Sequence, residues 1–460
     1  MLEITHHPLK GRCYSLSQPV SAGTLLLKAA PFALVPDCES RRRVCASCLC
    51  WSEQSTFLHH TCFSTYSNVE AIPGSRSVSL NELFFQQVPK KSCTKVSDKS
   101  SGRVGPPCHQ VFYCSVECSE RDWVDYHAVE CSFFRELFMG IPAPLPMLTE
   151  ANAFRDLDDF DNYSLDFLWM LMRVLIRRAR EVAGVPLLPT TGASQDFPTF
   201  DQVWAICDNA DSFPLESIQL FHRIASRLSV FVREHLLVAF PGIPVDGLLP
   251  KTSDKKQEPQ QHLFDSLVSL ICKEECNSFG LYTFRYLGPQ YSRQGYALAL
   301  YPTAVFFNHA CTPNVGHVTR SSTTGKEMLF YSLKDLKAGD EALISYLALE
   351  TNHPDTPTLS TAERRQKLKE HFFFDCDCDR CAQELGGTSE EKADFLKSQL
   401  CTLNGCRGRF VPGFPGVFDS SAPNTISSDY KSDRKDSGKS FSQESSTQVQ
   451  WRCEACHRFR

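Results

Sequence analysis

Hydrophobic positions in the middle of the chain recur with the period of an α-helix. Between Leu165 and Ile176 the apolar side chains are three to four residues apart, and the same spacing follows Pro214 and runs from about His262 to Lys273. These segments predict three amphipathic helices. The first also carries arginines between and after its apolar positions, and we expect these arginines to be solvated surface charges: Arg173, Arg177 and Arg178.

Short apolar or aromatic runs flank the helical block on both sides. They are bounded by Gly, Pro or charged residues, which is typical of strands. They lie at residues 24–27, 297–301, 328–331 and 342–346. Two other stretches, at about 92–107 and about 412–450, are rich in Ser and Lys and predict disordered inserts. Strands around a helical middle predict an α+β fold.

The composition is that of an ordinary globular protein, with 42% hydrophobic and 22% charged residues. Forty-eight basic and 53 acidic side chains leave a net charge of -5 over 460 residues, which excludes a nucleic-acid binder held by bulk positive charge. No run of 18 apolar residues predicts a transmembrane helix, and the first residues lack the features of a signal peptide. We expect a location in the nucleus, the cytoplasm or both. Neither a membrane partner nor direct nucleic-acid binding is indicated.

Cysteine is unusually frequent, with 22 in the chain. Without a secretory signal, bound metal explains them better than disulfides, because thiolates are soft ligands that suit zinc. Ligands four residues apart can lie one turn apart on one face of a helix, and a Cys-x2-Cys pair can bind a metal from a turn. The pairs with such spacings are Cys114 with Cys118, His127 with Cys131, and Cys45 with Cys48.

This arrangement, with a tyrosine before Cys114 and a tryptophan before His127, resembles a MYND zinc finger. The resemblance implies two zinc sites. One would be formed by Cys45, Cys48, Cys114 and Cys118. Three corners of the other would be Cys108, His127 and Cys131. Its fourth ligand would come from across an insert, with Cys62 preferred and Cys93 as the alternative. Such a finger also presents a shallow groove for an extended proline-containing peptide.

Two further cysteine groups lie in the last hundred residues or so of the sequence. Cys376, Cys378 and Cys381 are one ligand short of a tetrahedral zinc site, so a partner must come from elsewhere in the chain. Two more pairs, separated by the second predicted insert, are typical of a small zinc ribbon: Cys401, Cys406, Cys453 and Cys456. We expect Trp451 to pack on this ribbon.

Two segments carry the signature of a catalytic domain. Asn-His-Ala-Cys-Thr-Pro-Asn at 308–314 and Gly-Asp-Glu-Ala-Leu-Ile-Ser-Tyr at 339–346 resemble the paired motifs of a SET domain, the protein-lysine methyltransferase fold. Residues 10–12 and 22–27 resemble its first strands. The order of these motifs around the finger is similar to that of the SET-and-MYND (SMYD) family. The implied α+β fold is a SET-domain β-fold that is split by the finger and a helical insert and followed by a zinc-bound post-SET segment.

The resemblance also implies domain boundaries. These are 1–44 for the first SET part, 45–131 for the finger with an insert at about 63–107, 132–275 for the helical linker, 276–350 for the SET core, 351–385 for the post-SET segment and 386–460 for the ribbon with an insert at about 412–450. We expect no C-terminal helical-repeat domain of the kind that family members often carry.

The implied activity is transfer of a methyl group from S-adenosylmethionine to a lysine side chain of a histone or another protein. Tyr346 resembles the family's tyrosine at the end of the lysine channel, where its hydroxyl orients the amine. The cofactor would be bound by residues that match the family's motifs: Lys10, Gly11, Arg12, Asn277, Asn308, His309 and Phe374. Cys311 would be the fourth ligand of the post-SET zinc, and the chain would hold about four Zn²⁺ ions.

Two departures from the family's pattern concern the site itself. Cys13 stands where the family has the last glycine of a Lys-Gly-Arg-Gly loop, so its side chain could crowd the cofactor or tilt the backbone. Phe372 stands where the family often has a tyrosine that faces the channel.

An alternative interpretation is a zinc-dependent scaffold, in which the finger binds a proline-containing peptide and the SET domain is weak or inactive.

Overall fold

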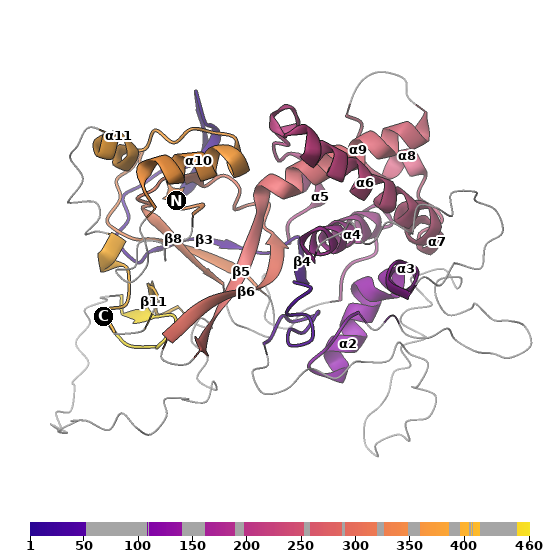
Figure 1. Cartoon of the computed structure of the whole chain (residues 1–460), viewed down its shortest axis with the longest axis horizontal. Coiled ribbons are helices and arrows are strands. Elements are labelled where there is room, and N and C mark those ends of the chain that lie inside the picture. The colour runs from indigo at the N-terminus through magenta and orange to yellow at the C-terminus, as the bar shows by residue number, and fades with distance from the viewer. Residues whose placement is uncertain are drawn as a thin grey trace, which may run out of the picture.

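The computed structural model of the chain places most strands in one lobe and the longer helices α4 (Asn162–Val182), α6 (Leu215–Phe231) and α9 (Pro259–Asn277) in another, with the hairpin of β5 (Ser278–Leu287) and β6 (Gln290–Leu300) between them (Figure 1). The structure describes residues 1–51, 108, 110–139, 162–188, 197–252, 258–287, 290–319, 326–347, 359–385, 396–403, 406, 408–414 and 449–460. Among the helices in these ranges, none has the length and apolar character that crossing a membrane requires.

The other helices are short. The region expected to form the finger, 45–131, holds α2 (Val116–Asp122), a π-helical turn (Trp123–His127) and the start of α3 (Ala128–Met139), which continues past it. The helical lobe adds α5 (Phe200–Trp204), a 3-10 turn (Ala210–Ser212), a π-helical turn (Val232–Leu236), α7 (Leu237–Ala239) and α8 (Val245–Leu248). The post-SET segment forms α10 (Thr361–Phe372) and α11 (Asp379–Leu385).

The described strands form several small sheets. They are β1 (Leu2–His7), β2 (Gly11–Leu16), β3 (Leu25–Ala29), β4 (Ala33–Pro36), β7 (Asn308–His309), β8 (Val315–Thr319), β9 (Met328–Ser332), β10 (Leu343–Ile344), β11 (Phe410–Pro412) and β12 (Trp451–Cys453), besides β5 and β6. Their orders are β1-β2, β3-β9-β8, β4-β6-β5, β7-β10 and β11-β12. Four strands were predicted from short apolar runs, and each run overlaps an observed strand. The runs at 24–27, 297–301, 328–331 and 342–346 overlap β3, β6, β9 and β10 in that order.

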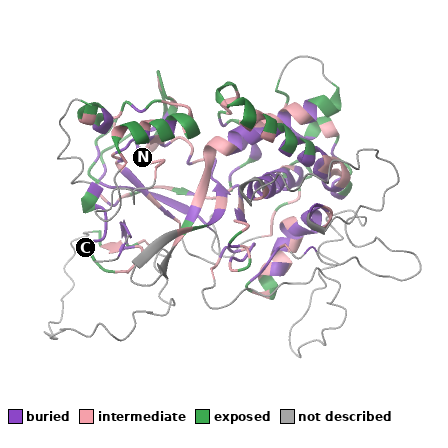
Figure 2. Ribbon diagram, viewed as in Figure 1, coloured by how far each residue is buried: buried purple, intermediate pink, exposed green. Residues whose placement is uncertain are grey.

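The three helices predicted from hydrophobic spacing are α4, α6 and α9, and their apolar faces meet in one core. Leu168, Leu175, Leu228, Leu267 and Leu270 are at most 1% exposed within it. Figure 2 shows α4 as the most continuously buried of these helices. An amphipathic period therefore located the helices, because each buries its apolar stripe against the others.

The prediction that the α4 arginines are solvated surface charges is wrong for two of them. Arg173 is 1% exposed and Arg177 is 5% exposed, whereas Arg178 is half-buried. Arg173 forms ion pairs with two buried carboxylates of the finger, at 2.8 Å to Asp122 and 3.0 Å to Glu130. Arg177 lies 4.2 Å from the centre of the Phe32 ring and donates to backbone carbonyls of the segment before β4. Buried charges persist only when they are paired in this way.

The two SET-like motifs cross at β7 and β10. These strands pair in parallel, with Asn308 opposite Leu343 and His309 opposite Ile344. The backbone of β2 runs alongside, because Tyr14 N–H donates to the Phe306 carbonyl at 2.9 Å. The crossing thus joins three segments that are far apart in sequence.

Candidate functional site

A cleft with a volume of about 170 Å³ opens beside this crossing. Aromatic and aliphatic parts of its lining come from Phe307, Ile344, Tyr346 and Phe372. Other parts of its lining come from the end of α9, from the edge strands β5 and β8, and from Arg409 near the C-terminus. Of the residues predicted for the site, Tyr346 and Asn277 line this cleft.

The Tyr346 side chain is held in the lining of the cleft by a hydrogen bond. Its O–H donates to the Phe307 carbonyl at 2.9 Å, and burial raises the pKa of Tyr346 above its usual value. The phenol therefore stays protonated at neutral pH. Because the proton is directed at the carbonyl, the oxygen keeps lone pairs for a donor that enters the cleft.

His309 connects Tyr346 to the cysteines of the post-SET segment. Its Nδ1 accepts from the backbone N–H of Tyr346 at 3.0 Å, and its Nε2 lies 3.3 Å from Cys311 Sγ. Burial lowers the pKa of His309 to about 4, so the ring is neutral. Since Nδ1 accepts, the ring proton is on Nε2 and is directed at the Cys311 sulfur.

Two of the residues predicted to bind the cofactor, Lys10 and Asn308, contact Glu341. Lys10 Nζ is 3.1 Å from Glu341 Oε2, and Asn308 Nδ2 donates to Glu341 Oε1 at 2.9 Å. Gly11 has a φ of +75°, which favours glycine. Arg12 donates to the Ala205 carbonyl of the helical lobe and lies 5.0 Å from the centre of the Phe306 ring.

Asn277, Phe372, Phe374 and Cys13 are each held by contacts of their own. The Asn277 amide nitrogen donates to the Lys273 carbonyl at 2.7 Å and to the Cys207 carbonyl at 3.4 Å. Phe372 packs on Tyr346 with ring centres 4.8 Å apart, and Phe374 packs on His309 at 5.9 Å. Cys13, which replaces a family glycine, is buried and has its Sγ 3.3 Å from the Thr5 hydroxyl of the same hairpin.

Among the described residues, four groups of Cys and His side chains could each hold a metal ion. Within each group the ligand atoms all lie within 4.8 Å of one another. The groups are Cys45, Cys48, Cys114 and Cys118; Cys311, Cys376, Cys378 and Cys381; Cys401, Cys406, Cys453 and Cys456; and Cys108, His127 and Cys131. The structure thus brings together the sets that the spacing and the resemblance suggested.

Sulfur–sulfur distances in these groups fit a tetrahedral metal rather than a disulfide. Cys48 and Cys114 are 3.6 Å apart, Cys311 and Cys381 are 3.6 Å apart, and Cys406 and Cys453 are 3.7 Å apart. A tetrahedral zinc with Zn–S bonds of about 2.3 Å places its ligands ~3.8 Å apart. The three four-cysteine groups therefore fit zinc in both number and spacing.

Details of the finger differ from the expectation. Cys114 is not on a helix with Cys118, because α2 begins after the Ser115 N-cap, whose side chain accepts from Cys118 N–H. Cys62 and Cys93, the alternative fourth ligands of the second finger site, both lie outside the described residues. The three ligands that are described, Cys108, His127 and Cys131, are all buried.

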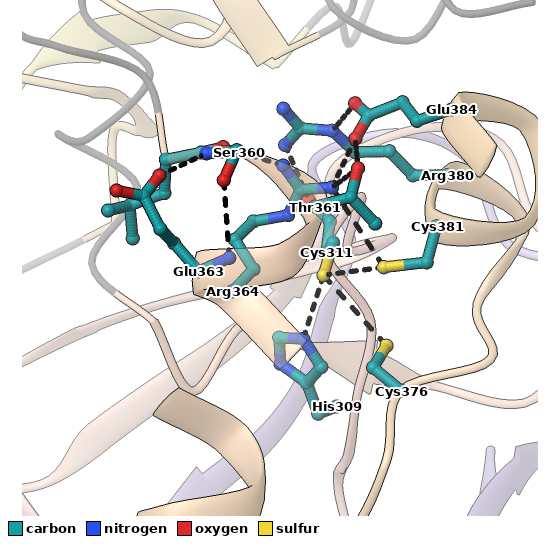
Figure 3. Close-up of polar contacts among 11 residues, drawn as sticks. His309, Cys311, Ser360, Thr361, Glu363, Arg364, Cys376, Arg380, Cys381 and Glu384 are labelled. Carbon is teal, nitrogen blue, oxygen red and sulfur yellow. Dashed lines mark hydrogen bonds and ion pairs between the residues drawn. The ribbon is translucent and has the colours of Figure 1, made fainter. Parts of the chain in front are cut away.

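The post-SET cysteines are held by a charged cluster that the sequence did not reveal (Figure 3). Arg364 of α10 lies 3.9 Å from Cys381 Sγ and pairs with Glu384 of α11. Arg380 donates to the same carboxylate at 2.7 Å. Arg380 lies inside the cysteine run and Glu384 lies one turn after it, whereas Arg364 is 12 residues before it. Proximity to the ligand run is a signal that could have found Arg380 and Glu384, but not Arg364.

Comparisons with known proteins agree with this geometry. Residues 11–347 match the model of the SET domain. A SET and MYND domain-containing protein of Dictyostelium discoideum is 22% identical over 316 residues, which cover 66% of this chain and 72% of that protein. The histone-lysine N-methyltransferase SMYD3 of Mus musculus is 23% identical, covering 63% of this chain and 50% of its own length. The N-lysine methyltransferase SMYD2 of Homo sapiens is 24% identical, covering 60% and 46% respectively. The chain therefore belongs to the SET domain family and is distantly related to SET and MYND domain proteins.

Proposed function

We propose that the protein is an S-adenosylmethionine-dependent methyltransferase whose acceptor is a lysine side chain of a histone or another protein. The observation that carries the proposal is the position of Tyr346. Tyr346 lines a cleft together with Phe307, Ile344 and Phe372, and it lies inside the segment that matches the SET domain. The names of SMYD3 and SMYD2 describe lysine methyltransferases, which supports the same reaction class.

The cleft supplies what a lysine acceptor needs. When bound, S-adenosylmethionine supplies an electrophilic methyl group on its sulfonium sulfur. The acceptor nitrogen can attack only when it is uncharged, because an ammonium has no lone pair. Walls formed by Phe307, Ile344 and Phe372 exclude water and thereby lower the pKa of an entering lysine. The Tyr346 oxygen accepts from the amine N–H and holds its lone pair in line.

The residues around the crossing are proposed to hold the cofactor. Asn308 and His309 would do so mainly through the backbone of β7, and Lys10, Gly11 and Arg12 through the turn before β2. Asn277 would contact the amino-acid end, and Phe374 would pack near the adenine. Zinc would occupy the four cysteine-containing groups, and that of the post-SET segment would fix Phe372 and Phe374 beside Tyr346. Thiolate ligands must remain reduced, so the proposal places the protein in the nucleus or cytoplasm.

A transfer experiment tests the proposal directly. The purified chain, loaded with zinc, is incubated with methyl-labelled S-adenosylmethionine and an array of lysine-containing peptides, including histone tails. We expect label on lysine side chains of some peptides and none when the lysine is replaced by arginine. If the cofactor binds no more tightly than to an unrelated zinc protein, the chain is not a methyltransferase. The scaffold that binds proline-containing peptides through its finger would then be the better interpretation.

A further inference from the structure

The described part of the C-terminal ribbon packs directly on the lobe that holds most of the strands. Val411 of β11 is fully buried, and Trp451 of β12 packs edge-on to Tyr331 of β9 with ring centres 5.9 Å apart. Phe414 contacts the same tyrosine at 5.9 Å. Phe414 lies in the stretch at 412–450 that was predicted to be disordered, and Val411 and Trp451 lie beside it, so residues at its two edges pack against the side chains of β8 and β9. In Figure 1 the ribbon lies against the strand lobe, close to β8.

This packing brings Arg409 to the cleft. Arg409 immediately precedes β11 and lines the same cleft as Tyr346. Among the described residues that line the cleft, Arg409 is the only lysine or arginine. It is 8% exposed, so its position is set by its neighbours rather than by solvent.

Two partners fix the Arg409 guanidinium. Its Nε donates to Glu454 Oε1 at 2.7 Å, and a terminal nitrogen donates to the His317 carbonyl of β8 at 3.4 Å. Glu454 lies between the ribbon cysteines Cys453 and Cys456, and its backbone N–H donates to the Arg409 carbonyl at 2.9 Å. The contacts therefore form a chain from the metal-binding turn of the ribbon, through Arg409, to an edge strand of the cleft.

Gly408 shows how tightly the two parts are joined. A Cβ atom at this position would lie 2.5 Å from Cys453 Sγ and 2.6 Å from Ala455 Cβ, so the backbone before Arg409 must pass directly over the ribbon turn. This close approach fixes the backbone beside Arg409, and the contacts of the guanidinium with Glu454 and His317 fix its side chain.

We propose that Arg409 is a positioning residue for the methyl-accepting peptide, and that the ribbon is part of the acceptor site. Its charge and its bond to His317 fix the wall of the cleft that the peptide must cross to bring a lysine to Tyr346. This inference rests on the proposed methyltransferase function. It assigns the ribbon a role in acceptor binding and none in cofactor binding.

The test uses the full zinc-loaded chain and the best peptide from the array. Arg409→Gln should raise the KM and the Kd of the peptide about tenfold, because the charged hydrogen bond that holds His317 in the cleft wall is lost, while kcat and cofactor affinity stay within about twofold. Arg452→Gln is the matched control. Arg452 is also a ribbon arginine, but it donates to the His457 carbonyl and does not line the cleft, so the peptide constants should not change.

A charge exchange separates positioning from stability. The double variant Arg409→Glu with Glu454→Arg restores the ion pair and should restore the melting temperature and the zinc content. It places a carboxylate at the cleft wall, however, so the peptide KM should remain raised. If the exchange restores the peptide KM, or if Arg409→Gln leaves it unchanged, Arg409 only stabilises the ribbon and the inference is wrong.

The two proposals fail differently. If the parent chain methylates no peptide, the methyltransferase proposal fails. Peptide Kd values, which need no turnover, then still decide the role of Arg409. If the parent neither methylates nor binds any peptide, both proposals are wrong.

Discussion

The backbone N–H of Tyr346 donates to Nδ1 of His309 at 3.0 Å. The other ring nitrogen of His309 faces Cys311, a member of the post-SET cysteine group. One neutral imidazole thus links the tyrosine of the cleft to the group that we propose binds zinc. The hydrogen bond from Tyr346 fixes its tautomer, so a change at Tyr346 or at Cys311 should alter the geometry at the other residue through His309.

Removing the Tyr346 hydroxyl should slow the reaction more than it weakens cofactor binding. Tyr346→Phe keeps the ring packed on Phe372 but removes the oxygen that accepts from the amine. We expect turnover to fall by about tenfold or more, roughly 1.4 kcal/mol of barrier, in a labelled-methyl assay, with cofactor Kd nearly unchanged by calorimetry.

Tyr301→Phe is the matched control for this variant. Tyr301 is also buried, and its hydroxyl also donates to a backbone carbonyl, that of Lys326 at 2.5 Å, but it does not line the cleft. Equal turnover for Tyr346→Phe and the parent, or an equal loss in both variants, would remove the role assigned to Tyr346.

The buried ion pairs of Arg173 should make this side chain essential for stability. Arg173→Met leaves Asp122 and Glu130 buried without their cation, and we expect a loss of about 3–5 kcal/mol in the free energy of unfolding by urea. Arg178→Met is the control on the same helix. Arg178 is half-buried and donates to the Leu248 carbonyl, so the loss should be about 1 kcal/mol. Similar losses in the two variants would show that the ion pairs contribute little.

Asp166 should make stability fall as the pH rises. Burial raises its pKa to about 7, against about 3.9 in the unfolded chain. Between these values the folded state holds a proton that the unfolded state has released, so the folded state loses stability as pH increases. Asp166→Asn removes the titration, and its Oδ1 can still accept from Cys38 N–H, which lies 2.7 Å from Asp166 Oδ1. We expect a gain of roughly 1–3 kcal/mol at pH 8 and a smaller gain at pH 5, measured by urea unfolding. Equal gains at both pH values would contradict the raised pKa.

Features set by local spacing could be predicted from the sequence, and features set by docking could not. The period of apolar residues located α4, α6 and α9, and ligand spacing found Cys376, Cys378 and Cys381. The burial of Arg173 depends on carboxylates in the finger, more than 40 residues earlier in the chain. The place of Arg409 depends on Trp451 and Phe414 packing on Tyr331. Nothing in the local pattern of an arginine distinguishes a solvated charge from a buried one, because its partners arrive only through the tertiary fold.

Metal analysis should find about four zinc ions in freshly purified protein, one for each Cys- or Cys/His-containing group. Cys406→Ser should lower the count by about one and loosen the ribbon without emptying the other groups, because its thiol belongs to the ribbon group alone. Elemental analysis against protein concentration gives the number. Two ions or fewer in the parent would mean that at least two of the groups do not bind zinc.

The post-SET group and the first finger group should differ in their effect on catalysis. Cys378 shares its group with Cys311, which contacts His309, and Phe372 and Phe374 lie just before this group in the chain. Cys378→Ser leaves three thiolates and a poorly held metal, so the aromatics beside Tyr346 should become mobile. Mobile aromatics neither exclude water from the lysine nor cover the cofactor, so turnover and cofactor affinity should fall together.

Cys114→Ser is the matched comparison, because Cys114 also belongs to a group of four cysteines but lies in the finger, away from the cleft. It should lower the melting temperature of the finger and leave turnover and cofactor Kd closer to those of the parent. Both variants are compared only after circular dichroism shows that each remains folded. Full activity in Cys378→Ser together with its loss in Cys114→Ser would mean that the post-SET group does not hold the cleft in place, and that the finger does.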